Sequence, residues 1–119
     1  MKDKSYEKKL SGLVACLGES EEYIVGKAHV ILDFSKIDEF EDNAILVTEQ
    51  TNPECTVAME KALAVLTERG GVLCHAAIVC RDLNKPCIVG IRNLINEVSS
   101  GQEIKISIKT GDVFINNKN

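Results

Sequence analysis

The fold of this chain is decided by the stretch Thr67-Glu68-Arg69-Gly70-Gly71-Val72-Leu73-Cys74-His75-Ala76-Ala77-Ile78-Val79. Before it, residues 62–66 form a short apolar run of the kind that makes a buried strand. Gly70 and Gly71 then interrupt the pattern and give the backbone a freedom that other residues lack. From His75 onward, small and apolar residues with a polar face at Arg81-Asp82 indicate a helix. His75 is therefore predicted to lie where a glycine-containing loop enters a helix.

A histidine in that place has a specific chemical use. The first turn of a helix exposes backbone N–H groups and carries the positive end of the helix dipole, so it favours an anion. Neutral imidazole can attack a phosphoryl group and hold it as a covalent intermediate. The residues alone also fit a histidine that caps the helix or lies on the surface, so both interpretations stand at this point.

The pattern extends beyond this stretch and resembles a known signature. The matching positions are Thr67, Glu68, Gly70, Gly71, Cys74, His75, Ala76, Ala77, Arg81, Pro86, Val89 and Gly90. Their order and spacing are similar to the phosphohistidine signature of the mobile, or swivelling, domain of the phosphoenolpyruvate-utilising enzymes. This family includes phosphoenolpyruvate synthase, pyruvate phosphate dikinase, enzyme I of the sugar phosphotransferase system and rifampicin phosphotransferase.

The resemblance implies a role for each matching site residue. His75 would be the phosphoryl acceptor, and Gly70 and Gly71 would let the phosphate approach the backbone. Thr67 and Cys74 would complete a phosphate-binding site, although a threonine at a strand end is equally often structural. Arg81 is expected to point away from His75. Several family members carry a threonine where this chain has Leu73, so a regulatory hydroxyl is absent there.

The resemblance also implies that this chain is one component of a phosphotransferase and not a complete enzyme. It has no Gly-x-x-x-x-Gly-Lys-Ser/Thr loop and is too small to hold a nucleotide-binding fold as well. Magnesium and ATP or phosphoenolpyruvate are therefore expected on partner domains, with no metal or cofactor held by this chain. Those partners would be an ATP-grasp nucleotide-binding domain and a domain that binds phosphoenolpyruvate or pyruvate.

The rest of the chain indicates short strands and helices in mixed order, an α/β fold. Strands are expected at residues 23–32, 44–48 and 87–90, with a hairpin at 104–108 and 113–115. One helix is expected to begin at Asn52-Pro53 and run to residue 61, and a second to be capped by Asn93. The resemblance implies a three-layer β/β/α swivelling domain, with residues 10–119 as a single domain after a frayed tail at residues 1–9.

Composition excludes several other classes of protein. The net charge of −4 and an aromatic content of 4% argue against nucleic-acid binding. No apolar segment approaches the ~20 residues of a membrane span. The five cysteines have no Cys-x-x-Cys spacing, so they indicate reduced thiols in the cytoplasm rather than disulfides or a zinc site. His29, on the polar face of the first strand, is given no role.

Two alternatives remain at this level. The chain could be a non-catalytic interaction module that keeps the swivelling-domain fold and binds a partner. It could also be a thiol-based redox or metal protein that uses Cys74, Cys80 and Cys87, in which case those three sulfurs would converge in space.

Overall fold

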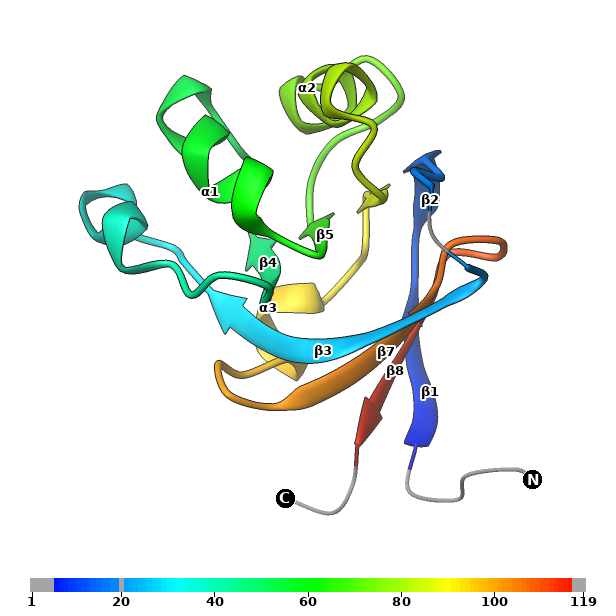
Figure 1. Cartoon of the computed structure of the whole chain (residues 1–119). Coiled ribbons are helices and arrows are strands. Elements are labelled where there is room, and N and C mark those ends of the chain that lie inside the picture. Colours follow the sequence, from blue (N-terminus) through cyan, green and yellow to red (C-terminus); the bar gives the residue numbers. More distant parts are fainter. Residues whose placement is uncertain (1–5, 20, 117–119) are drawn as a thin grey trace.

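The computed structural model describes residues 6–19 and 21–116 as a mixed eight-stranded sheet with three α-helices on it (Figure 1). The strands are β1 (Tyr6–Ser11), β2 (Leu13–Cys16), β3 (Tyr23–Val30), β4 (Ile45–Thr48), β5 (Ala64–Thr67), β6 (Cys87–Val89), β7 (Glu103–Ser107) and β8 (Asp112–Asn116). The helices are η1 (Phe34–Glu39), η2 (Pro53–Cys55), α1 (Thr56–Lys61), α2 (His75–Leu83) and α3 (Leu94–Glu97), of which η1 and η2 are 3₁₀-helices. The expected α/β class is confirmed.

The strand order is β1-β8-β7-β3-β4-β5-β6-β2. Strands β3, β4, β5 and β6 run parallel, whereas β1, β8 and β7 pair antiparallel and join the parallel part through β3. The carboxyl ends of the four parallel strands therefore lie at one edge of the sheet. Every loop that leaves this edge can contribute to a common site.

Successive side chains along the parallel strands point to opposite faces of the sheet and so contribute to two separate hydrophobic cores. Ile45 and Val47 of β4 pack with the inner face of β7 and β8, while Leu46 between them packs against the helices. The same alternation holds in β5 and β6, whose residues are all fully buried. Strands buried on both faces read as continuous apolar runs, which is why these segments were recognisable in the sequence. Figure 1 shows α1 and α2 together over the parallel strands.

The amino-terminal segment joins the two edges of the sheet. The structure corrects the expectation of a tail that extends to Lys9, because Tyr6–Ser11 form β1 and pair with β8. Residues 1–5 lie outside the described residues. After β1 the chain turns at Gly12, whose N–H donates to the Gly111 carbonyl at 2.9 Å, and continues as β2 beside β6. Consecutive strands thus occupy opposite ends of the strand order.

The sequence predicted capping residues at the start of two helices, and the structure confirms one of these caps and corrects the other. Asn52 accepts a hydrogen bond from the Glu54 N–H at 2.9 Å, as a capping residue before Pro53 should. Asn93 occupies the residue before α3 but adopts a left-handed backbone and makes no side-chain cap. The Glu68 carboxylate accepts from the Ile95 N–H at 2.9 Å instead.

No helix in the described part of the chain is long and apolar enough to cross a membrane.

Replacing Gly111 by alanine is expected to destabilise the fold strongly. Gly111 has a φ of +85°, and an added Cβ would overlap the Gly12 carbonyl oxygen at the point where the two sheet edges meet. We expect Gly111→Ala to lower the free energy of unfolding by about 3 kcal/mol, which urea denaturation measures. Gly101→Ala is the matched control, because Gly101 has a φ of +89° and open space around it. Its cost should be about 1 kcal/mol, the backbone strain alone. Equal losses in both variants would contradict the contact with Gly12.

Candidate functional site

His75 is the first residue of α2 and is half-buried at the carboxyl edge of the parallel strands. Its ring is fixed by one contact: Nδ1 lies 2.8 Å from the Thr51 hydroxyl. Thr51 is 8% exposed, so this bond is shielded from water on the threonine side. Among the described residues, Nε2 has no hydrogen-bond partner. The sequence-based placement of His75 at the entry to a helix is confirmed.

Thr51 was missed in the sequence because nothing near it in the chain marks it. It follows β4, which pairs in parallel with β5 so that Thr48 lies opposite Thr67. The loops after these two neighbouring strands leave the same edge and bring Thr51 against the histidine, 24 residues later in the chain. The available signal was indirect: β4 and β5 both end in a threonine, and the loops after adjacent parallel strands meet at one edge.

A small pocket of about 190 Å³ opens beside the imidazole. It is lined by Gln50, Thr51, Thr67, Arg69, Gly70, Cys74, His75 and Ala76. Cys74, the residue before α2, makes no side-chain cap. The first N–H groups of a helix have no partner within the helix, so in the described part of the structure those of His75 and Ala76 can bind an anion in this pocket.

The predicted site residues divide into two groups. Thr67, Gly70, Cys74 and His75 line the pocket together, whereas Gly71 does not. Gly70 has a φ of +120°, and an added Cβ would lie 2.7 Å from the Cys74 sulfur, so this position requires glycine. An added Cβ on Gly71 would meet open space. The Thr67 hydroxyl donates to the Arg69 carbonyl oxygen at 2.6 Å and so holds the loop in shape.

The charged residues of the motif lie around this loop. Arg69 lines the pocket, and its Nε is 3.2 Å from a carboxylate oxygen of Glu49. Glu68 is turned away from His75 to cap α3. Arg81, expected to point away from His75, donates from Nε to the Ala15 carbonyl oxygen at 3.1 Å. Arg69 was not singled out in the sequence, because a single arginine beside a Gly-Gly pair carries no distinctive spacing.

The redox alternative requires Cys74, Cys80 and Cys87 to converge, and the structure places all three, together with Cys16, in one cluster around α2. Cys16 lies opposite Cys87 in the β2–β6 pairing, and its sulfur is 3.8 Å from the Cys80 carbonyl oxygen. A hydrogen bond with Cys80 and then burial raise the pKa of the Cys87 thiol far above its ordinary value. Such a thiol stays protonated and unreactive. The described residues contain no group of histidine, cysteine and acidic side chains that could hold a metal ion.

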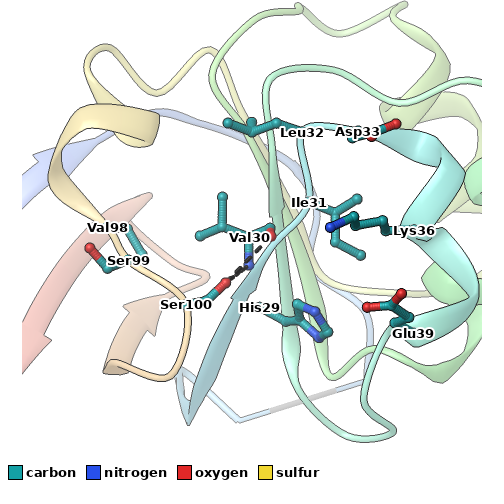
Figure 2. A pocket seen from close by; sticks show the side chains of 10 residues that line it. All are labelled: His29, Val30, Ile31, Leu32, Asp33, Lys36, Glu39, Val98, Ser99 and Ser100. Atoms are coloured by element: carbon teal, nitrogen blue, oxygen red, sulfur yellow. Dashed lines mark hydrogen bonds between the residues drawn. The ribbon is translucent and has the colours of Figure 1, made fainter.

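A larger hollow lies elsewhere, at the end of β3. It has a volume of about 520 Å³ and is lined by residues 29–33, Lys36, Glu39 and residues 98–100, none of which borders the His75 pocket (Figure 2). His29 stacks on Phe40 and accepts from the Glu41 N–H at 3.1 Å. This hollow contains no residue of the signature, so the smaller pocket is the candidate site.

Comparison with known proteins agrees with this geometry. The family model described as "PEP-utilising enzyme, mobile domain" matches residues 40–111. Phosphoenolpyruvate synthase of Aquifex aeolicus is 38% identical over 89% of this chain, and that of Pyrococcus furiosus is 39% identical over 82%. The chain spans only 12% of the length of each of these two relatives.

Two solved structures share the fold. A solution structure of Enzyme I has a TM-score of 0.57 and 27% identity, and the match covers 67% of this chain and 33% of that one. The aconitase X structure from Thermococcus kodakaraensis has a TM-score of 0.63 at 15% identity, covering 89% and 96%, which is a likeness of fold alone. The matched region contains the whole pocket around His75, and the chain therefore belongs to the mobile-domain family of the PEP-utilising enzymes.

Proposed function

We propose that this chain is a phosphoryl carrier that is transiently phosphorylated on Nε2 of His75. The contact between the Thr51 hydroxyl and Nδ1 carries this proposal. When Nδ1 holds the ring proton and donates it to Thr51, the lone pair of the neutral imidazole is on Nε2. A neutral, oriented nitrogen beside an anion-binding pocket is the arrangement that a nucleophilic histidine needs.

The transfer can be written with its bonds balanced. The Nε2 lone pair forms a bond to the donor's phosphorus while the P–O bond to the donor breaks and its electron pair leaves on the donor oxygen. The proton on Nδ1 remains near Thr51 and balances part of the new charge. In the second step an acceptor oxygen attacks phosphorus, and the N–P electron pair returns to Nε2. The chain is thus restored.

The loop around His75 would hold the phosphoryl oxygens. The free N–H groups at the start of α2 are donors for them, and Gly70 leaves space because it has no Cβ. Thr67 and Cys74 shape the same pocket. Gly71, outside the pocket wall, is left out of this assignment.

Donor and acceptor would be bound by other domains. We propose an ATP-grasp domain and a phosphoenolpyruvate- or pyruvate-binding domain as partners, with ATP or phosphoenolpyruvate and magnesium bound there. The small share of its relatives that this chain covers supports this, as do exposed apolar side chains on α1, on α2 and in the loop before α2. Those side chains are Val57, Val72, Leu73 and Ile78, of which Leu73 is 79% exposed.

We further propose the three-layer β/β/α organisation of a swivelling domain and a cytoplasmic location. The first is supported by two cores on opposite faces of the same parallel strands. The second is supported by the five cysteines, all of which are free thiols.

Replacing His75 by alanine should abolish phosphorylation. The test incubates the chain with labelled ATP and a phosphoenolpyruvate synthase whose own acceptor histidine has been replaced. We expect acid-labile, base-stable label on this chain, absent from His75→Ala. His29→Ala is the control and should be labelled normally, because His29 lies at another hollow. A chain that binds the synthase but takes no label would be an interaction module instead.

Replacing Thr51 by valine should slow phosphorylation of His75 about tenfold, the effect of one hydrogen bond. The valine keeps the shape of the side chain but leaves Nδ1 without a partner, so the ring is free to rotate and to carry its proton on Nε2. Initial labelling rates measure the effect, and Thr51→Ser should restore most of the rate. A valine variant that matches the native rate would show that Nδ1 needs no partner.

A further inference from the structure

Arg69 provides the only cationic side chain among the residues that line the His75 pocket. Its backbone N–H donates to the Glu49 carbonyl oxygen at 2.9 Å, and its Nε is 3.2 Å from the Glu49 carboxylate. Backbone and side chain are therefore both tied to the same residue. This double attachment fixes Arg69 at the mouth of the pocket even though its side chain is 67% exposed.

The attachment leaves part of the guanidinium unused. A guanidinium has five N–H donors in a planar fork, and the bond to Glu49 occupies only the one on Nε. No described residue binds the four donors on the terminal nitrogens, and two of them can bind a phosphoryl group side by side. A phosphoryl group would otherwise sit in a chain of net charge −4, where no broad positive field supports it.

We propose that Arg69 binds the phosphoryl group carried by His75, and that Glu49 is a positioning residue that orients the Arg69 guanidinium. This inference rests on the proposed carrier function and adds to it the group that neutralises the phosphate. Glu68, the other acidic residue next to Arg69, is bound to the Ile95 N–H. Glu49 is therefore the one acidic side chain that pairs with Arg69 in the described structure.

A bound cation has a measurable effect on the phosphate. It stabilises the fully deprotonated phosphohistidine over the form with one more proton, so it lowers the pKa that the phosphorus signal reports for this group, called the phosphoryl pKa below. Removal of the cation should raise that pKa. We expect a rise of about half a unit, because the exposure of Arg69 screens the interaction. A merely structural role for Arg69 would leave this pKa unchanged.

The experiment phosphorylates the intact chain with phosphoramidate, a chemical donor that requires no partner domain. The phosphorus NMR signal absent from His75→Ala is assigned to His75 and titrated in the native chain and its variants. We expect Arg69→Gln to raise the phosphoryl pKa by about half a unit and Arg69→Lys to restore part of it. Lys27→Gln is the control, because it removes the same charge from β3, outside the pocket. It should titrate like the native chain.

Two variants of Glu49 separate its effect on the orientation of the Arg69 guanidinium from the effect of its own negative charge. Glu49→Gln keeps an oxygen that can accept from Nε but removes a negative charge, so it should leave the phosphoryl pKa unchanged or lower it by up to about 0.2 unit. Glu49→Ala removes the same charge and the acceptor as well, so its phosphoryl pKa should lie about 0.3 unit above that of Glu49→Gln.

Three outcomes are distinguishable. The expected shifts in Arg69→Gln with no shift in Lys27→Gln support the inference. Labelled His75 with the same titration in Arg69→Gln as in the native chain overturns the role of Arg69 and leaves the carrier function standing. A folded chain in which His75 takes no phosphate from phosphoramidate overturns the carrier function, and the inference with it.

Discussion

The parallel pairing of β4 with β5 is the constraint on which both the fold and the site depend. It places Thr48 opposite Thr67 and directs the two following loops out of the same edge of the sheet. One loop brings Thr51 and the other brings His75, and their side chains meet at 2.8 Å. Because both loops start from paired strands that are buried throughout, the pairing of β4 with β5 decides that these two side chains meet.

Helix α2 serves packing and chemistry at once. Its buried residues, Ala76, Ala77 and Cys80, cover the parallel strands, and small side chains let the helix approach them closely. The same packing fixes where the helix begins, and therefore where its free N–H groups point. His75 at the first position is held between the core and solvent. A phosphoryl group there would be reached from outside while the helix stays anchored from beneath.

The cysteines illustrate how burial separates reactive from structural groups. Cys80 and Cys87 lie in the core under α2, and their contact keeps the Cys87 thiol protonated. Cys74 lies at the pocket and fills the space that Gly70 leaves open. Proximity of sulfur atoms thus follows from packing two short strands under one helix. In our proposal the chemistry of the site belongs to the imidazole and its neighbours, and the thiols contribute shape.

Local patterns in the sequence determined the apolar parallel strands, the capped start at Asn52 and the helix that begins at His75. These elements depend on residues close together in the chain, so composition and spacing encode them. Only the tertiary structure decided that Thr51 fixes the imidazole, that Glu49 holds Arg69, and that the amino-terminal residues form a strand with β8. Each of these contacts joins segments brought together by strand pairing, and no local pattern records which distant partner a side chain will meet.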